Sequence, residues 1–375
     1  MTPPIAPSLC KRLDNTSWML WFKTSNQYSI IDNLFKEALD SVMSSPSKAL
    51  FLDTWSESLG LKEAEARWNQ VISYLELCQT PQEDTDILTI KAPPEVPLQQ
   101  PPIYLDIHGT TIAIETDDNK TLQTVFPALA VYQVFQPKQG ATVTFSIFRK
   151  EGIMYLLKNG QLLRVVKQHA YHIIQGTFTT HILCSIAPCK LQTLLGTLHA
   201  STVVNNSGNA IALIGHSGRG KSTLTALLGQ HGFEVLADDV SALDTSHNIL
   251  YNPNGISIKQ GAYMVLNPYY PELETTPKHL FNTQKGPIRY LHNAHSKLDK
   301  HLCQTIVLVA YNPNAEEGLL PIDKKTALET LIPESWLSAS TEHAKLFMDW
   351  CAALTCYQLT YHNIETAVTA LNQLR

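Results

Sequence analysis

A glycine-rich stretch at residues 215–222 constrains the fold of this chain more than any other feature. It reads Gly-His-Ser-Gly-Arg-Gly-Lys-Ser, follows the apolar run 211–214 directly, and precedes leucines at helical spacing. A strand, a glycine loop and a helix in this order are typical of a phosphate-binding loop. Its backbone N–H groups would surround a polyphosphate at a helix N-terminus, which favours anions. The stretch therefore predicts binding of a nucleoside triphosphate, and the alternative is an ordinary glycine-rich turn.

The chemistry of this loop assigns a role to each kind of residue in it. Lys221 would reach the outer phosphates of ATP, and the Ser222 hydroxyl would bind Mg²⁺. The expected nucleotide contacts are Gly215, His216, Ser217, Gly218, Arg219, Gly220, Lys221, Ser222 and Thr223.

A pair of carboxylates follows the next expected strand. The run 233–237 is apolar enough for a short strand and ends in Asp238 and Asp239. A parallel α/β sheet places its ligand crevice at this end of its strands. A carboxylate there can hold Mg²⁺ or accept a proton from an attacking hydroxyl. Adjacent strand residues point to opposite sides, so we expect the two carboxylates to divide these tasks. The alternative is an Asp pair that opens a turn.

A histidine precedes the loop at a position from which it can return to the phosphates. Residues 194–204 end in a β-branched run, and 205–208 form a turn into the strand before the loop, which indicates a hairpin. The hairpin would bring His199 near the nucleotide. A lone histidine is more often structural, so that alternative stays open.

These three features together resemble the catalytic core of the HPr kinase/phosphorylase-like family. Leu-His-Ala-Ser at 198–201, the loop at 214–222 and Gly-Phe-Glu-Val-Leu-Ala-Asp-Asp at 232–239 keep the order and near spacing of that family. The match spans about residues 196–240, with a looser match to about 374. The resemblance implies that Asp239 is the base for the acceptor hydroxyl, that His199 supports this step, and that Asp238 helps to hold the metal.

One departure from that family concerns the acceptor. The family carries Glu-Ile-Arg-Gly after the Asp pair, which supplies a further carboxylate and helps to dock the protein HPr. Residues 253–260 read Pro-Asn-Gly-Ile-Ser-Ile-Lys-Gln and contain no glutamate. HPr itself and the reverse phosphorylase activity are therefore not expected to carry over.

Composition excludes several other classes of protein. The apolar fraction of 44%, the charged fraction of 16% and the net charge of −5 describe a soluble globular protein without a basic footprint for nucleic acid. No apolar run approaches the length of a membrane span, and no export signal is visible, so we expect a cytoplasmic protein. Seven cysteines and fourteen histidines show no metal-ligand spacing, which favours free thiols and no transition metal. Family members with this core are often oligomers, so a homo-oligomer is an open alternative.

Residues 1–80 are expected to form a small helical domain. Two sets of apolar residues recur at helical spacing: Ile30, Ile31, Leu34, Phe35, Ala38, Leu39 and Val42, and then Leu61, Ala64, Trp68, Val71, Ile72 and Leu75. Residues 18–22 suggest a short strand. In length, position and pattern this part resembles the small PqqD-like modules that grip a leader peptide; a plain helical packing domain is the alternative.

A proline-rich linker at 81–102 should separate this domain from a β-rich lobe at 103–190. Strands are expected at 103–107, 111–115, 142–148, 154–157 and 162–166, with a turn at 158–160, while 122–135 is ambiguous between helix and strand. The remaining residues, 191–375, would form the kinase domain. It should contain a hairpin over 249–258, a short helix at 262–266, a buried strand at 305–310, a last strand at 357–361 and helices at 325–331, 341–353 and 365–374.

The segment 278–295 is polar and carries Lys285 and Arg289. It could close over the transferring phosphate as a basic loop, or it could be a solvated surface loop.

The expected architecture is an α/β P-loop kinase core preceded by a β-rich lobe and a small helical N-terminal domain. The expected activity is transfer of the γ-phosphate of ATP, with Mg²⁺, to a Ser or Thr hydroxyl of a peptide or protein acceptor. Two alternatives stay open: a kinase for a small metabolite such as serine, and a nucleotide-gated binding module without an acceptor.

Overall fold

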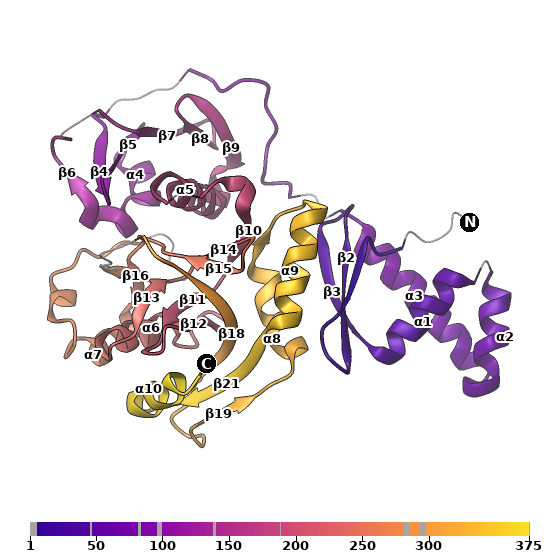
Figure 1. Cartoon of the computed structure of the whole chain (residues 1–375). Helices are drawn as coiled ribbons and strands as arrows, with labels where there is room; N and C mark the ends of the chain where they lie inside the picture. The colour runs from indigo at the N-terminus through magenta and orange to yellow at the C-terminus, as the bar shows by residue number, and fades with distance from the viewer. Residues whose placement is uncertain are drawn as a thin grey trace.

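Four β-sheets and the helices around them make up the computed structural model (Figure 1). The structure describes residues 6–45, 47–81, 84–95, 100–137, 140–187, 189–280, 286–292 and 298–374. It is a mixed α/β structure whose sheets have three, ten, two and six strands.

The chain begins with a three-stranded antiparallel sheet followed by three helices. These elements are β1 (Leu9–Arg12), β2 (Ser17–Phe22), β3 (Gln27–Asp32), α1 (Asn33–Ser44), α2 (Lys48–Leu59) and α3 (Leu61–Gln79). The strand predicted at 18–22 and the helix predicted from Leu61 are present. The helical stripe expected from Ile30 was wrong at its start, because Ile30 and Ile31 lie in β3. The Asp32 side chain accepts a hydrogen bond from the Phe35 N–H (2.7 Å). This cap makes helix α1 begin at Asn33, after the two isoleucines.

Strand β2 is buried on both faces of this sheet. Leu20 and Phe22 pack against the helices α1–α3 on one side. Met19 and Trp21, on the other face, belong to the same apolar cluster as Phe347, which lies more than 300 positions later in the chain. The alternation of strand side chains explains this pattern, since successive residues point to opposite faces. The N-terminal sheet is therefore packed into the C-terminal part of the chain through helix α9 (Thr341–Ala353).

The proline-rich segment runs along the six-stranded sheet. Leu88 donates its N–H to the Val165 carbonyl (2.9 Å), and Leu88 and Ile90 pack against buried residues of that sheet. The sheet has the order β6-β4-β5-β7-β8-β9 and consists of β4 (Ile103–Ile107), β5 (Thr110–Thr116), β6 (Gln133–Val134), β7 (Val143–Lys150), β8 (Ile153–Lys158) and β9 (Gln161–Lys167). Asn159 and Gly160 have φ of 50° and 77°, which makes the predicted tight turn between β8 and β9.

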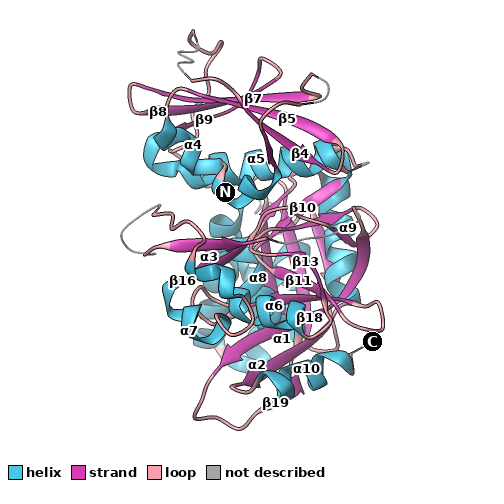
Figure 2. Ribbon diagram, turned by 90° about the vertical axis from the view of Figure 1, so that its left-hand side faces the viewer, coloured by secondary structure: helices cyan, strands magenta, loops and turns pink. Residues whose placement is uncertain are grey.

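Helices cover the face of this sheet that is turned toward the rest of the molecule (Figure 2). The ambiguous region 122–135 contains the end of α4 (Asn119–Val125), a 3₁₀ helix (Pro127–Tyr132) and the short β6. Helix α5 (Tyr171–Ile186) then crosses the same face, where Ile174, Phe178 and Ile182 are buried against the sheet.

The ten-stranded sheet carries the glycine-rich loop. Its path is β13-β11-β12-β18-β15-β14-β10-β20, and β21, with β19 beside it, also pairs with β18. Its strands are β10 (Leu194–Leu198), β11 (Ser201–Val204), β12 (Ala210–Ile214), β13 (Glu234–Ala237), β14 (Ser241–Asp244), β15 (Asn248–Leu250), β18 (Lys300–Tyr311), β19 (Gly318–Pro321), β20 (Trp336–Leu337) and β21 (Thr355–Tyr361). Strand β11 is antiparallel to both β12 and β13, so these two strands end at the same edge of the sheet.

The hairpin expected over 249–258 was wrong. Strand β15 instead pairs with β14 and β18, and β16 (Ile256–Lys259) pairs with β17 (Ile288–Leu291) in a separate two-stranded sheet. Asn252 explains the separation, because its N–H binds the Leu236 carbonyl (2.9 Å) and its side-chain amide binds the Val240 carbonyl (2.8 Å). Proline follows directly at position 253 and offers no N–H for continued pairing.

Part of the basic segment 278–295 forms strand β17, while the described residues Lys278 and Leu280 are exposed. Arg289 lies within β17 and is only 9% exposed. Its guanidinium stacks over the Tyr263 ring at 4.6 Å and donates to the Glu274 carbonyl (3.1 Å). Lys285 lies outside the described residues.

The remaining helices cover the ten-stranded sheet. They are α6 (Lys221–Gln230), α7 (Tyr263–Leu266), α8 (Lys324–Leu331), α9 and α10 (Ile364–Asn372). The short helix, the long strand, the last strand and the three C-terminal helices were all predicted within a few residues. Among the described residues, no helix combines the length and the apolar character needed to cross a lipid bilayer.

Replacing Trp21 with alanine is expected to destabilise the whole chain, because its ring is fully buried between the N-terminal sheet and the C-terminal core. Loss of a large buried aromatic side chain costs about 3–5 kcal/mol. Urea unfolding followed by circular dichroism measures this loss. The control is Leu61→Ala, whose side chain is 61% exposed. A C-terminal part that unfolds at the same urea concentration as in the parent would contradict the shared core.

Candidate functional site

The glycine-rich loop lies between the end of β12 and the start of α6. Gly215, Gly218 and Gly220 have φ of 142°, 86° and 91°, a region that side chains with a Cβ rarely adopt. They turn the chain sharply before α6 begins at Lys221. The Lys221 ammonium is buried and donates to the Gly215 carbonyl at the base of the loop. Burial lowers the pKa of Lys221, while nearby carboxylates, first Asp239 and then Glu334, oppose that shift.

Asp238 is the buried centre of the site. Its carboxylate accepts hydrogen bonds from the Ser201 hydroxyl (2.6 Å) and from the Ser257 N–H (3.0 Å). The Ser222 hydroxyl on the loop helix is near enough to act on the pKa of Asp238, which it lowers. Burial, and then the charge of Asp239, raise the pKa of Asp238. A carboxylate with a serine hydroxyl nearby offers an all-oxygen donor set, which suits Mg²⁺.

Strand β16 brings a second lysine to the loop. Ile256 and Ile258 are buried on one side of the strand, and Ser257 and Lys259 alternate with them. The backbone N–H of Ser257 donates to Asp238, and the Lys259 ammonium donates to the Ser217 hydroxyl (3.0 Å). Its charge is close enough to contribute to the lowered pKa of Lys221. Two ammonium groups thus lie at one loop, where their positive charge would favour a bound polyphosphate.

The second carboxylate of the pair points away from Asp238. Asp239 has φ of 66° and a side chain that is 61% exposed. One of its oxygens, Oδ1, lies 3.5 Å from Nδ1 of His199, which occupies the turn between β10 and β11. On the other side of the same ring, Nε2 lies 3.3 Å from Oε2 of Glu334. The imidazole is therefore flanked by two carboxylates.

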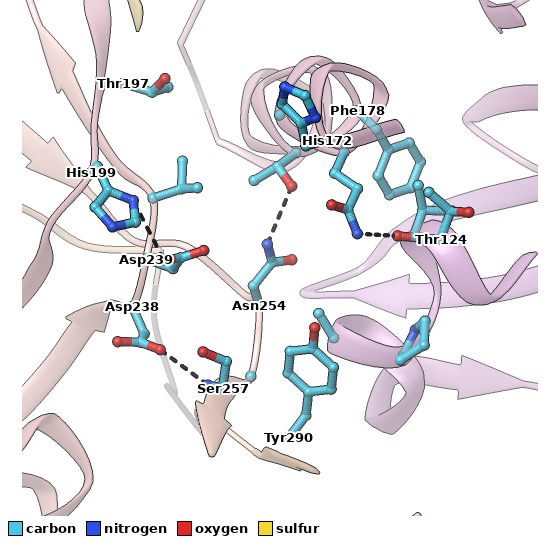
Figure 3. Close-up of a pocket in the computed structure, with 18 of the residues that line it drawn as sticks. Thr124, His172, Phe178, Thr197, His199, Asp238, Asp239, Asn254, Ser257 and Tyr290 are labelled. Atoms are coloured by element: carbon cyan, nitrogen blue, oxygen red, sulfur yellow. Dashed lines mark hydrogen bonds and ion pairs between the residues drawn. The ribbon is translucent and has the colours of Figure 1, made fainter. Parts of the chain in front are cut away.

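A pocket of about 290 Å³ opens beside Asp239 (Figure 3), and the described lining includes no residue of the glycine loop. Helix α5 forms one wall with His172, Gln175 and Thr179, and the core forms the other with His199 and the Asp pair. Tyr290 and Asn254 lie at the side where these walls meet (Figure 3), and the Asn254 amide donates to the Thr179 hydroxyl (3.2 Å). Burial, and then the charges of Asp239 and Asp238, raise the pKa of Tyr290.

Trp336 closes one end of the pocket by packing against a glycine of helix α5. A Cβ placed on Gly176 would lie 1.7 Å from a carbon of the Trp336 ring, so no larger residue fits at this position. Glycine inside a helix costs about 1 kcal/mol relative to alanine. The close contact of α5 with the ten-stranded sheet therefore depends on a glycine at position 176, which leaves room for the Trp336 ring.

The structure brings Lys221, Ser222, Asp238, Asp239 and His199 together at one edge of the sheet. His216, Ser217, Gly218 and Arg219 are exposed on the loop. Thr223 is half-buried in the first turn of α6. Sequence reasoning missed Lys259 and Glu334. The alternation at 256–259 could have indicated the lysine, whereas no local pattern marks the glutamate.

Comparisons of the sequence with known proteins find no match. No family model matches it, and no curated protein matches it. Among solved structures, it is similar to the Hpr(Ser) kinase/phosphatase from Coxiella burnetii, with 11% sequence identity and a TM-score of 0.24. The match covers 47% of this chain and 94% of the other. A likeness of this size is distant, so function has to be inferred from the residues of the site.

Replacing Lys259 with glutamine is expected to weaken the binding of Mg·ATP by about tenfold, since a hydrogen bond to a charged group contributes about 1.5 kcal/mol or more. The affinity for adenosine should stay within about twofold, because the lysine faces the phosphate loop. Titration calorimetry measures both. The matched control is Lys345→Gln, an exposed lysine on α9. Unchanged affinity for Mg·ATP would show that Lys259 does not contact the phosphates.

Proposed function

We propose that this chain is an ATP-dependent kinase that transfers the γ-phosphate to a Ser or Thr hydroxyl of a peptide or protein acceptor. One observation carries the proposal: the Ser222–Asp238 pair at the glycine loop and the Asp239–His199 pair at the pocket lie back to back at the end of β13. A nucleotide site and a pocket for a second substrate thus meet at two adjacent carboxylates.

On the nucleotide side, the chain's own groups fit a bound Mg·ATP. The loop N–H groups and the ammonium groups of Lys221 and Lys259 would bind the phosphates, and Ser222 with Asp238 would hold the metal. Bound Mg²⁺ neutralises charge on the transferring phosphate. When ATP binds, the Lys221 ammonium would exchange its hydrogen bond to the Gly215 carbonyl for one to a phosphate oxygen. A hydrogen bond between two charged groups is stronger than one to a neutral carbonyl.

On the acceptor side, Asp239 is the group placed to accept the hydroxyl proton. Its exposed carboxylate faces the pocket, and its positive φ directs it away from Asp238. As the acceptor oxygen bonds to the γ-phosphorus, the bond to the ADP oxygen breaks and the hydroxyl proton passes to Asp239. Most of the rate should come from positioning and charge neutralisation, with Asp239 contributing orientation and proton acceptance.

We favour a peptide or protein acceptor because of the N-terminal sheet. Within the described residues β3 pairs only with β2, so its other edge offers backbone groups to an added strand. This is consistent with the resemblance of residues 1–80 to a peptide-recognition module. Deleting those residues is a poor test, because Met19 and Trp21 belong to the core of the C-terminal part.

The test is intact-mass analysis of candidate acceptor peptides, among them those encoded beside the gene, incubated with the protein and Mg·ATP. We expect a gain of one phosphate, about 80 Da, on one acceptor. Lys221→Ala should abolish it. A phosphorylated free metabolite instead would support the small-molecule alternative, and nucleotide binding without any phosphorylated product would support a nucleotide-gated binder.

Asp239→Asn is expected to lower kcat by about 100-fold or more while leaving the Kd for Mg·ATP within about twofold, since general-base groups contribute about 10²–10⁴ to rate. Single-turnover transfer to the acceptor and calorimetry measure the two quantities. The asparagine side chain shares the shape of aspartate, so folding should be unaffected. Transfer by Asp239→Asn as fast as by the parent would rule out a base at this position.

A further inference from the structure

Among the described residues that line the pocket, Glu334 is the carboxylate that the proposed function does not use. It reaches the site from the short 3₁₀ helix Ile332–Glu334, more than 90 positions after the Asp pair. Its Oε2 lies 3.3 Å from Nε2 of His199, on the opposite side of the ring from Asp239. Its charge also acts on Lys221. A carboxylate on the far side of a histidine is chemically significant because the two ring nitrogens are distinct.

We propose that Glu334 is a positioning residue that accepts the Nε2–H of His199 and holds the ring with Nδ1 turned toward Asp239. Carboxylate oxygens only accept hydrogen bonds, so a ring that lies between two carboxylates is satisfied when Nδ1–H points to Asp239 and Nε2–H points to Glu334. Glu334 supplies the acceptor at Nε2. This inference rests on the proposed kinase function, because orienting His199 matters only if Asp239 must be aimed at an acceptor hydroxyl.

The chain fixes Glu334 through the strand that follows it. Strand β20 pairs with β10, so that Trp336 lies opposite Thr197 and Leu337 opposite Gly196. The N–H of Ser338 continues this pairing to the Leu195 carbonyl (2.9 Å). Strand β10 ends directly before His199. The histidine and the glutamate are therefore carried by two neighbouring strands, which sets their separation.

Two further contacts hold β20 from outside the ten-stranded sheet. The Trp336 ring lies against Gly176 of helix α5. On the other side, the Asn26 side-chain amide donates to the Leu337 carbonyl (2.9 Å), and its oxygen accepts from the Trp21 indole N–H (3.0 Å). The segment that carries Glu334 is thus clamped between the lobe and the N-terminal sheet. A carboxylate that served only solubility would need no such support.

A competing role for Glu334 is to balance the charge of Lys221. The two roles predict different kinetics. A charge-balancing glutamate would change the affinity for Mg·ATP when removed, whereas a positioning residue would change the rate of transfer. A residue that acts through His199 also has no further effect once His199 is replaced.

The experiment compares Glu334→Ala, Glu334→Gln, His199→Gln and the double variant Glu334→Ala/His199→Gln, with Glu329→Ala as matched control. Glu329 is an exposed glutamate on α8, 3.9 Å from Lys325. We expect Glu334→Ala to lower kcat by about tenfold or more, a part of what an acid–base group contributes. Glu334→Gln, which keeps an acceptor oxygen, should recover much of this loss. The Kd for Mg·ATP should stay within about twofold.

The double variant decides whether Glu334 acts through the histidine. We expect it to be no slower than His199→Gln alone. Losses that multiply in the double variant, or a loss confined to nucleotide affinity, would overturn the proposal.

A measurement without turnover separates this proposal from the kinase function. In protein labelled with ¹⁵N-histidine, the ring nitrogen signals of His199 are identified by their absence in His199→Gln. We expect them to show a proton on each ring nitrogen in the parent and to shift in Glu334→Ala, but not in Glu329→Ala. Unchanged signals in Glu334→Ala overturn the positioning role even if the kinase is active. A shift without phosphoryl transfer to any acceptor would keep the geometry and reject the kinase.

Discussion

The burial of the Asp238 carboxylate is the constraint on which the rest of the site depends. A carboxylate that is shielded from water must be hydrogen-bonded, or its burial costs several kcal/mol. Its hydrogen-bond partners come from two separate elements, Ser201 on β11 and Ser257 on β16, and Ser222 on α6 lies near enough to affect its pKa. The requirement of one buried carboxylate therefore ties a strand of the large sheet to the separate two-stranded sheet, beside the loop helix. The glycine loop and the pocket take their places on either side of this junction.

The pocket beside Asp239 depends on the close approach of helix α5 to the ten-stranded sheet. Helix α5 belongs to the six-stranded lobe, yet it forms a wall of a pocket whose reactive groups belong to the other sheet. Close approach is possible because Gly176 leaves room for the Trp336 ring. The lobe is therefore more than a scaffold, since residues of α4 and α5 line part of the pocket.

Much of the site could be predicted because its signals are local in sequence. The glycine loop, the Asp pair and His199 lie within about 40 positions, on strands and a helix whose patterns are clear. Lys259 and Glu334 escaped prediction because their positions depend on the pairing of β16 with β17 and of β20 with β10, and those partners are distant in sequence. The strand β3 was misread as helix because Ile30 and Ile31 suit either period until the Asp32 cap is known. The hairpin at 249–258 failed because Asn252 binds Leu236 of β13 and Val240 just after it instead.

The apolar cluster shared by Trp21 and Phe347 has a consequence for how the chain is made. A ribosome that adds about 5–20 residues per second needs on the order of 15–65 s to travel from one to the other. During that time the N-terminal sheet has one covered face, packed on its own helices, and one bare face that carries Met19 and Trp21. The N-terminal sheet is thus synthesised first but can complete its packing only when α9 has been made. Until α9 is synthesised, the nascent chain carries a surface that a chaperone would bind.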